Sequence, residues 1–457
     1  GQAVRLEFEV GTSRFMRRFM TQEMNLEKED MYQIDGPLDM TVFFGFCGIK
    51  GYNHLRYPEA HPHSPWSMLE LKRTPETNIF DMIREKDLLI HLPYESFDES
   101  VVNFLYSAAN DKDVLAIKQT LYRVSSSSPV VQALEKAVQN GKQVTVLMEV
   151  KARFDEANNI LMARRLEKAG AHVIYGLVGL KTHSKCTLVI RREKDGIRRY
   201  VHVATGNYNA STAKLYTDLG ILTCNDRFGI DASAFFNLLS GYSDPPIWDS
   251  FIVAPINLRQ RCIELIDREI HFAKNGEDAH MIAKMNSLLD KGIIEKLYEA
   301  SQAGVKIELI VRGICVLIPG IPGISDNITV RSIVGRFLEH SRIFWFRNGG
   351  REELYISSAD WMPRNLNDRV ELMVPIEDPE IKRRLKQMVD IELSDNQKAH
   401  IMQADGTWLK TISAENQLCA QEYFQKIAEK RDAEDEMTLA QKLEPYTPVL
   451  GHGDGSD

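Results

Sequence analysis

The sequence predicts an α/β protein made of two homologous α/β domains, preceded by a small α+β segment. Short β-branched runs alternate with helical stretches along most of the chain, which is the pattern of layered α/β domains. This order of elements occurs twice, and a short motif centred on His183 and on His340 occurs once in each copy. A duplication on this scale predicts two similar domains that form one site between them.

Residues 1–75 differ in character from the rest of the chain. Residues 4–10 alternate between apolar and polar side chains, as a strand does, and residues 15–24 have helical spacing. Residues 57–65 are rich in proline, which favours an extended or irregular conformation. We therefore expect a small α+β unit followed by a linker.

The first α/β domain is predicted to span residues 78–245. Pro245 and Pro246 mark its end, because adjacent prolines continue neither a helix nor a central strand. The predicted elements are helices 99–110, 129–140 and 158–169, and strands 114–117, 144–148, 173–174, 187–190 and 200–203.

The second α/β domain is predicted to span residues 250–435, including a C-terminal helix, and it repeats the order of the first. Its predicted elements are helices 257–275 and 292–303, strands near Met281 and Ile307, and a long charged helix over 416–443. Residues 444–457 are expected to be a disordered tail.

The composition excludes some classes of function. The net charge of −8 argues against a general nucleic-acid binder, so the cations for an anionic substrate must be gathered locally. No run of 18 apolar residues is present, which predicts no transmembrane helix. The six cysteines are scattered without C-x-x-C spacing, which argues against a zinc site and fits reduced thiols in a cytosol.

The repeated motif is Lys-Thr-His-Ser-Lys at residues 181–185 and Glu-His-Ser-Arg at residues 339–342. Upstream of each copy lies a helical stretch that ends in glycine, and an apolar run follows that glycine. Each copy precedes a small polar turn, at residues 204–208 in the first half and at 357–361 in the second. Two halves that each offer one histidine suggest a single active site built between them.

A histidine can act as a nucleophile on phosphorus at neutral pH, provided that other groups assist it. A cation must neutralise the non-bridging oxygens, and Lys185 is expected on the same strand face as His183. A carboxylate must fix the imidazole tautomer. Asp218 follows His183 and Glu371 follows His340, and either of the two can set the tautomer of His340.

A small polar turn must also let the phosphate approach, and Gly206, Asn207 and Asn209 supply it in the first half. The catalytic candidates are His183, His340, Lys185, Asp218 and Glu371.

Four runs of the sequence resemble bacterial polyphosphate kinases of the first type, which belong to the phospholipase D superfamily. These runs are residues 115–124, 149–158, 180–185 and 202–209, and the resemblance covers about residues 1–435. It implies two phospholipase D-like domains behind a partial head domain. It also implies an enzyme, an ATP:polyphosphate phosphotransferase, that reversibly moves the γ-phosphate of ATP onto inorganic polyphosphate through a phosphohistidine.

The resemblance also implies roles for individual residues. His183 is the phosphorylated nucleophile, and His340 lies near the nucleotide phosphates. Arg123 and Arg153 match positions beside Mg²⁺, the implied cofactor; since an arginine has no free lone pair, we expect both to hold phosphate oxygens next to the ion. The expected ATP- and phosphate-binding residues are Tyr216, Arg312, His340, Arg123, Arg153, Arg342, Asn207 and Asn209.

The chain departs from the family pattern in two ways. Arg342 replaces a lysine, which still supplies a cation suited to phosphate. The N-terminal domain and the front of the head domain have no counterpart here. Two alternatives stay open: a phospholipase D-type phosphodiesterase and an inactive anion-binding fragment.

The resemblance implies ATP or ADP and inorganic polyphosphate as partners. It also implies that the protein forms a homo-oligomer. The expected location is cytoplasmic, with peripheral association with a membrane left open.

Overall fold

The structure is a computed structural model that describes residues 3–69, 77–125, 127–150, 156–241 and 247–443, with residues 432–443 described by their backbone alone. The chain divides into two compact units, residues 1–60 and residues 61–457. The prediction of disorder for 444–457 concerns residues outside the described ranges. The described part contains no helix that combines the length and the apolar character needed to cross a bilayer.

The smaller unit pairs two short parallel strands, β1 (Leu6–Glu9) and β2 (Met31–Ile34). Helix α1 (Arg14–Met24) connects them, and the Ser13 hydroxyl caps its N-terminus by accepting from the Met16 amide. The strand and the helix predicted for residues 4–10 and 15–24 are therefore confirmed.

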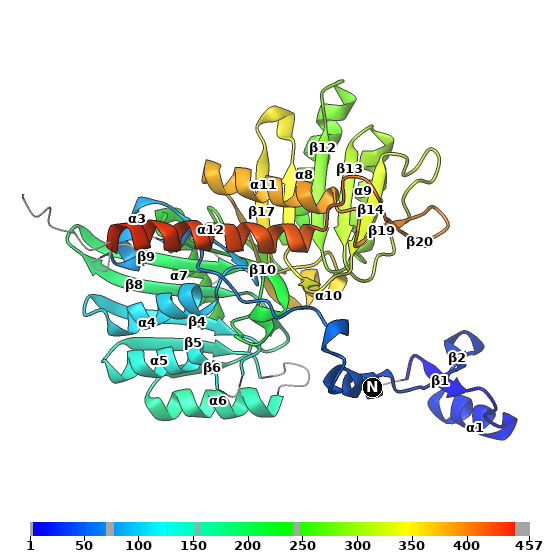
Figure 1. Cartoon of the computed structure of the whole chain (residues 1–457), viewed down its shortest axis with the longest axis horizontal. Helices are drawn as coiled ribbons and strands as arrows, with labels where there is room; N and C mark the ends of the chain where they lie inside the picture. Colours follow the sequence, from blue (N-terminus) through cyan, green and yellow to red (C-terminus); the bar gives the residue numbers. More distant parts are fainter. Residues whose placement is uncertain (1–2, 70–76, 126, 151–155, 242–246, 444–457) are drawn as a thin grey trace, which may run out of the picture. The chain divides into compact units, whose positions relative to one another are not determined.

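The larger unit contains two mixed sheets (Figure 1). The first has the strand order β15-β10-β9-β8-β4-β5-β6, with β3 also paired to β10. Its strands are β3 (Leu88–Leu92), β4 (Val114–Leu121), β5 (Gln143–Met148), β6 (His172–Tyr175), β8 (Cys186–Glu193), β9 (Gly196–Ala204) and β10 (Tyr216–Thr223). Its helices are α3 (Ile79–Glu85), α4 (Asn103–Asn110), α5 (Pro129–Gln139), α6 (Glu156–Ala169) and α7 (Asp226–Leu239).

The second sheet has the order β11-β18-β17-β16-β12-β13-β14-β19-β20, with β7 also paired to β18. Its strands are β11 (Ile252–Ala254), β12 (His280–Met285), β13 (Lys306–Val311), β14 (Ile328–Ile333), β16 (Ile343–Phe346), β17 (Glu353–Ser357), β18 (Arg369–Pro375), β19 (Ala399–Met402) and β20 (Trp408–Lys410). Its helices are α8 (Leu258–Lys274), α9 (Lys291–Gln302), α10 (Pro363–Asn367) and α11 (Pro379–Leu393).

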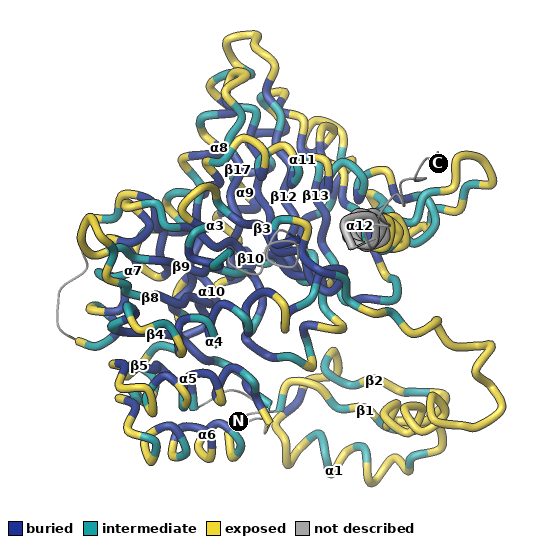
Figure 2. The backbone as a smooth tube through the Cα atoms, turned by 60° about the vertical axis from the view of Figure 1, so that its left-hand side comes forward, coloured by how far each residue is buried: buried dark blue, intermediate teal, exposed yellow. Residues whose placement is uncertain are grey.

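The two sheets repeat one topology. Strands β4, β5 and β6 are parallel neighbours, and β8, β9 and β10 follow in antiparallel order beside β4. Strands β12, β13 and β14 are likewise parallel, and β16, β17 and β18 follow in antiparallel order beside β12. The expected fold of two homologous α/β domains is confirmed, and their central strands are buried (Figure 2).

Two short strands are exchanged between the domains. Strand β7 (Lys181–Thr182) of the first domain pairs in parallel with β18 of the second. Strand β15 (Leu338–Glu339) of the second domain pairs in parallel with β10 of the first. Each exchanged strand ends one residue before a motif histidine, so the exchange places each histidine on the other domain.

The long charged helix predicted over 416–443 is helix α12 (Ala420–Leu443). It begins at Ala420, four residues later than predicted. Several hydrogen bonds hold its first turn in the unit. The Ala420 amide donates to Asp395 Oδ2 at 2.8 Å, and Gln421 Nε2 donates to the Phe337 carbonyl at 2.9 Å.

Candidate active site

The first histidine is fixed by the main chain of the second domain. The amides of His183 and Ser184 both donate to the carbonyl of Val370 at 2.9 Å. Val370 is followed by Glu371 on β18, and His183 Nδ1 lies 2.9 Å from the Glu371 carboxylate. This contact sets the tautomer of His183 with the proton on Nδ1.

Glu371 is fully buried and held on several sides. The Ser358 hydroxyl donates to one oxygen at 2.5 Å, and Asn365 Nδ2 donates to the other at 2.6 Å. Arg369 lies 4.0 Å away. Burial raises the pKa of Glu371, while the charge of Lys185 and the Ser358 hydrogen bond oppose this rise.

The second histidine mirrors this arrangement on the first domain. Its amide donates to Thr217 Oγ1 at 3.1 Å, and its Nδ1 lies 2.8 Å from Asp218. The Thr205 hydroxyl donates to Asp218 at 2.6 Å, as Ser358 does to Glu371. Burial opposes the ionisation of Asp218, but the contacts with His340 and Thr205 outweigh it and lower its pKa.

The carboxylates are thus crossed with respect to sequence order. Asp218, the carboxylate downstream of His183, contacts His340, and Glu371, the one downstream of His340, contacts His183. The physical reason is the strand exchange, because each histidine follows a strand that is paired with the carboxylate strand of the other domain.

Lys185 lies beside the first histidine, although not in the way that was predicted. Residues 183–185 lie between β7 and β8 rather than within one strand. The Lys185 ammonium nevertheless turns back to contact the His183 carbonyl and lies 3.1 Å from His183 Nδ1. The Tyr122 ring meets the His183 imidazole edge-on at 4.7 Å between centroids. Burial lowers the pKa of Lys185 to about 7.

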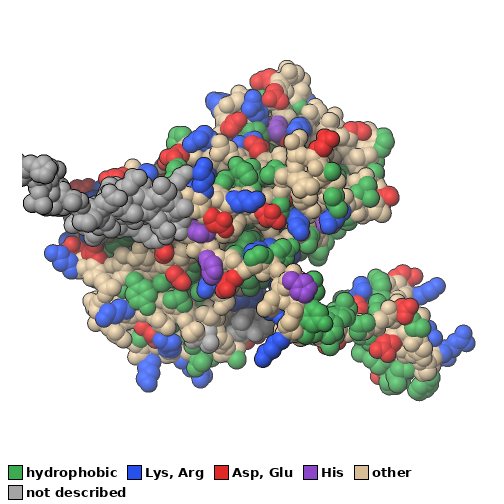
Figure 3. All heavy atoms as spheres, in the orientation of Figure 1, with side chains coloured by type: hydrophobic (Ala, Val, Ile, Leu, Met, Phe, Trp, Pro, Cys, Tyr) green, Lys and Arg blue, Asp and Glu red, His purple; other side chains and the backbone are tan. Residues whose placement is uncertain are grey.

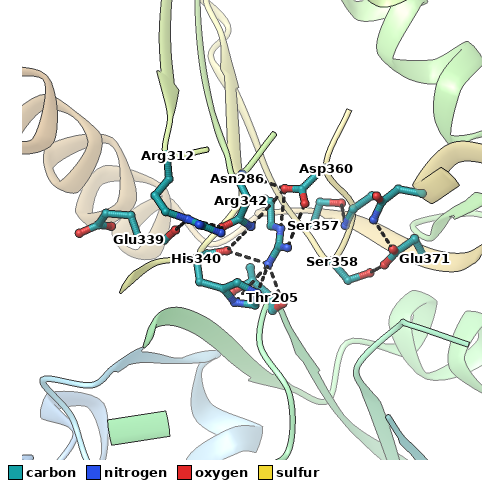
Figure 4. A network of polar contacts seen from close by, with 12 residues as sticks. Thr205, Asn286, Arg312, Glu339, His340, Arg342, Ser357, Ser358, Asp360 and Glu371 are labelled. Atoms are coloured by element: carbon teal, nitrogen blue, oxygen red, sulfur yellow. Dashed lines mark hydrogen bonds and ion pairs between the residues drawn. The ribbon is translucent and has the colours of Figure 1, made fainter. Parts of the chain in front are cut away.

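Arg342 is the matching cation in the second half, and it points between His340 and Asp360 (Figure 4). Its Nη1 donates to the His340 carbonyl at 2.7 Å and lies 3.2 Å from His340 Nε2. Its Nε and Nη2 contact the two oxygens of Asp360 at 3.1 and 3.3 Å. Burial disfavours the charged form of Asp360, but the ion pair with Arg342 lowers its pKa to about 2. The cation of the second half is therefore fixed by an ion pair, whereas Lys185 has no such dedicated carboxylate among the described contacts.

Both imidazoles are held neutral at neutral pH. Burial lowers the pKa of His183 well below its usual value, and the charges of Lys185 and Arg369 lower it further. Burial and Arg342 lower the pKa of His340. A positive charge on His340 would lower the pKa of His183 further, so protonation of one ring opposes protonation of the other. On the face of the protein that Figure 3 shows, acidic and basic side chains are interspersed.

The remaining predicted residues are distributed as follows. The Tyr216 ring lies 5.2 Å from the His340 ring. Arg312, directly after β13, donates to Asn286 Oδ1 at 2.9 Å and to the Glu339 carbonyl at 3.2 Å. Arg123 is half-buried and directly follows Tyr122 at the end of β4. Arg153 lies outside the described residues.

Three residues of the small turn in the first half, Gly206, Asn207 and Asn209, lie in different environments. Asn209 Oδ1 accepts from the amides of Ser211 and Thr212, so its side chain organises the turn itself. Asn207 Oδ1 is buried and has no hydrogen-bond partner among the described residues. A Cβ atom on Gly206 would lie 2.1 Å from Asp218 Oδ2, so only glycine allows Asp218 to reach His340.

Sequence reasoning missed the residues that support this arrangement: Thr205, Asn286, Ser358, Asp360, Asn365 and Arg369. Asp360 occupies the place in the second turn that Asn207 occupies in the first, so the duplication itself could have identified it. Thr205 and Ser358 likewise occupy matching places in the two turns. Asn286, Asn365 and Arg369 give no sequence signal, because their roles depend on contacts between distant segments.

Two family models match these domains. The model described as polyphosphate kinase C-terminal domain 1 matches residues 78–245, and the model described as polyphosphate kinase C-terminal domain 2 matches residues 251–421. The chain belongs to the polyphosphate kinase family.

Curated polyphosphate kinases resemble the chain closely. The protein of Halalkalibacterium halodurans is 54% identical over 402 residues, which cover 87% of this chain and 56% of that protein. The protein of a Synechocystis species is 49% identical over 448 residues, which cover 93% of this chain and 61% of that protein. The chain therefore spans less than two thirds of the length of these relatives.

A solved structure shares the fold. The crystal structure of polyphosphate kinase from Porphyromonas gingivalis aligns with a TM-score of 0.83 and 34% sequence identity, covering 94% of this chain and 65% of that one.

Proposed function

We propose that this chain forms the phosphotransferase core of a polyphosphate kinase, which moves the γ-phosphate of ATP to inorganic polyphosphate and back through a phosphohistidine. The observation that carries the proposal is the crossed pair of dyads, His183–Glu371 and His340–Asp218, each with a cation beside the imidazole. Membership of the polyphosphate kinase family supports the same reading.

The first step is the attack of His183 on ATP. Nδ1 faces Glu371, so Nε2 carries the free lone pair and no described polar contact engages it. Nε2 forms a bond to the γ-phosphorus while the bond to the β,γ-bridging oxygen breaks, and ADP leaves with that oxygen. Glu371 keeps the proton on Nδ1 and stabilises the positive charge that develops on the ring.

The second step returns the enzyme to its starting state. A terminal oxygen of polyphosphate forms a bond to the phosphorus, and the bond from phosphorus to Nε2 breaks. The polymer is then longer by one unit and His183 is again neutral. The Lys185 ammonium lies 3.1 Å from Nδ1 of the same ring, and we propose that it reaches the transferring oxygens when substrate binds, where its single compact charge can follow them through both steps.

The second histidine is assigned to the nucleotide side. Its ring faces the Tyr216 ring, and Arg312 donates to the carbonyl of Glu339, the residue before His340. Arg342 is held by Asp360 and so offers a fixed rather than a moving charge. We assign His340 as a contact of, or proton donor to, the nucleotide phosphates. Arg123 and Arg153 are proposed to hold phosphate oxygens.

Mg²⁺ fits this proposal as a partner of the nucleotide. Among the described residues, no three side chains of His, Cys, Asp or Glu gather as a metal site. Mg²⁺ retains several waters and binds readily to substrate phosphates, so phosphate oxygens next to the arginines would hold it and it would neutralise charge there. A homo-oligomer, a cytoplasmic location and peripheral association with a membrane stay predictions.

The test is incubation of the full chain with γ-labelled ATP, followed by quenching in base and mapping of the label by mass spectrometry. We expect acid-labile, base-stable label on His183, which His183→Ala abolishes; His340→Ala should still form the label and mainly impair its transfer to polyphosphate. His172→Ala, on the exposed face of β6, is the matched control and should label normally.

Label on His340 in the His183→Ala variant would reverse the assignment of the two histidines. Unlabelled protein that hydrolyses a phosphodiester would favour the phosphodiesterase alternative. Protein that binds polyphosphate but does neither would favour the anion-binding fragment.

A further inference from the structure

A buried group of charged side chains lies directly behind the second histidine, and the mechanism above does not use it. We call it the Glu339 network: Glu339, Lys284, Glu392, Thr217 and Gln421. Lys284 Nζ donates to Glu339 Oε2 at 2.7 Å and also forms an ion pair with Glu392. The three charged side chains are 2 to 3% exposed.

The network joins β15, which carries Glu339, to four other elements at the domain interface. Thr217 on β10 donates its hydroxyl proton to Glu339 Oε2 at 2.8 Å, and Gln421 on α12 donates to Glu339 Oε1 at 2.6 Å. Lys284 lies on β12 and Glu392 on α11. Both oxygens of the Glu339 carboxylate thereby accept from other elements: Oε1 from α12, and Oε2 from β10 and β12.

The network is one residue away from both members of the second dyad. Glu339 directly precedes His340, and Thr217 directly precedes Asp218. Thr217 Oγ1 also accepts from the His340 amide at 3.1 Å, so a single hydroxyl joins the network to the histidine. The Glu339 carbonyl accepts from Arg312 Nε at 3.2 Å, which ties the network to the proposed nucleotide side.

The charges in the network are costly. Two carboxylates face one ammonium, and Glu392 Oε2 is buried without a hydrogen-bond partner among the described residues. Burial raises the pKa of Glu392 to about 7, although Lys284 opposes the rise. Buried ion pairs contribute little net stability compared with apolar residues of similar size. Stability alone is therefore a poor reason for placing such a group here.

The first domain has a different residue at the position of Lys284. Thr120 takes the place of Lys284: it is the second-last residue paired between β4 and β5, as Lys284 is between β12 and β13. Its hydroxyl donates to the Ser184 carbonyl at 2.9 Å. The residue before His183 is Thr182, whose amide donates to Glu149 Oε2 at 2.9 Å. A hydroxyl thus stands beside the first histidine at the position where the second has the ion-paired ammonium of Lys284.

We propose that Lys284 and Glu392 are positioning residues for the second histidine, which hold Glu339 against β10 and α12 and so fix His340 over Asp218. The inference rests on the proposed function for its kinetic consequence, but its geometric consequence is independent of that function. Displacing Glu339 moves the backbone of His340 and the carbonyl that binds Arg312, while the contacts of His183 with Glu371 are untouched.

The kinetic test is a double-mutant cycle on the full chain. Glu392→Gln and Lys284→Met are each combined with His340→Ala, and Lys284→Arg serves as the conservative variant. We expect either single change to raise the KM for ATP or lower the transfer rate roughly tenfold, a typical effect for residues coupled through contact. In the His340→Ala background the same change should have less than about a twofold effect, and Lys284→Arg should recover most of the loss. Equal effects in both backgrounds would overturn the proposal.

The geometric test does not require activity. The rate at which diethylpyrocarbonate modifies each histidine is followed by peptide mass spectrometry in Glu392→Gln, which keeps the shape of the side chain. The modification rate of His340 should change at least about threefold while that of His183 stays within the error of the wild type. Unchanged reactivity at His340, or an equal change at both histidines, would overturn the proposal. This measurement remains decisive even if the chain forms no phosphohistidine.

The matched control is Lys296→Met, which removes an ammonium paired with Asp267 and Glu299 at the protein surface. It removes the same number of ion pairs as Lys284→Met but leaves the second histidine alone. Thermal unfolding of every variant identifies any that fail to fold; if Lys284→Met is one of them, Glu392→Gln and Lys284→Arg carry the test.

Discussion

The Nδ1 atom of His183 lies 2.9 Å from the carboxylate of Glu371, a residue of the other domain. The reciprocal contact, from His340 to Asp218 at 2.8 Å, crosses the interface in the opposite direction. Neither domain therefore contains a complete dyad. The site exists only where the two domains meet, and the exchanged strands β7 and β15 hold it there.

The crossed pairing predicts which histidine each carboxylate controls. Glu371→Gln should slow phosphorylation of His183 by roughly 10²–10⁴-fold, because the amide no longer stabilises the charge on the ring. Asp218→Asn should leave labelling of His183 largely intact and impair transfer. Single-turnover labelling with γ-labelled ATP measures the phosphorylation step, and loss of the label on addition of polyphosphate measures the transfer step.

The two variants serve as controls for each other, since each removes one buried carboxylate charge. A loss of His183 labelling in Asp218→Asn, with normal labelling in Glu371→Gln, would show that the carboxylates act within their own halves.

Gly206 is predicted to be essential for the second dyad. The Cβ of Gly206→Ala would collide with the Asp218 carboxylate and push it away from His340. A displacement of about 1 Å costs roughly 10²-fold in rate, which we expect in steady-state synthesis of polyphosphate. Gly292→Ala is the control, because its Cβ would meet Asp290 at an ordinary 3.5 Å. Full activity of Gly206→Ala would contradict the close approach.

The pairing of Arg342 with Asp360 predicts a stability effect. Asp360→Asn leaves a buried guanidinium without its counter-ion and should lower the free energy of unfolding by about 3–5 kcal/mol. Urea denaturation measures this. Asp195→Asn breaks a pair with Arg198 at the surface and should cost less than about 1 kcal/mol. Equal effects of the two changes would show that Asp360 contributes only as a surface residue does.

The buried histidines predict a loss of stability in acid. Burial lowers the pKa of His202 from 6.5 to about 3, so below pH 6.5 the unfolded chain binds a proton that the folded chain does not. The free energy of unfolding therefore falls as pH falls through 6.5, and His202 accounts for about 2 kcal/mol of that fall by pH 5. Urea denaturation of the wild type and of His202→Gln at pH 7 and pH 5 compares the two slopes. The same slope in both proteins would count against this prediction.

Local sequence pattern was sufficient where a segment's own side chains decide its structure. Helices α5 and α9 match the predicted ranges to within a residue, because an Asx or Ser side chain caps each one and its apolar stripe is regular. Strands β16, β17 and β18, and helices α7 and α11, were not predicted. Phe344 and Trp345 lie on neighbouring positions of β16 and are both buried, so that strand gives no alternation to read.

The sequence by itself determined the duplication, the two histidines and the cations beside them, because an internal repeat is visible without any knowledge of contacts. Only the tertiary structure decided which carboxylate serves which histidine, which side chain holds Arg342, and that the ion pairs of Lys284 lie behind His340 where the first domain has the Thr120 hydroxyl. The reason is that pairing between β7 and β18 and between β15 and β10 joins residues more than a hundred positions apart. Hydrophobic periodicity specifies an element and its buried face, but it carries no information on which distant strand will be its neighbour.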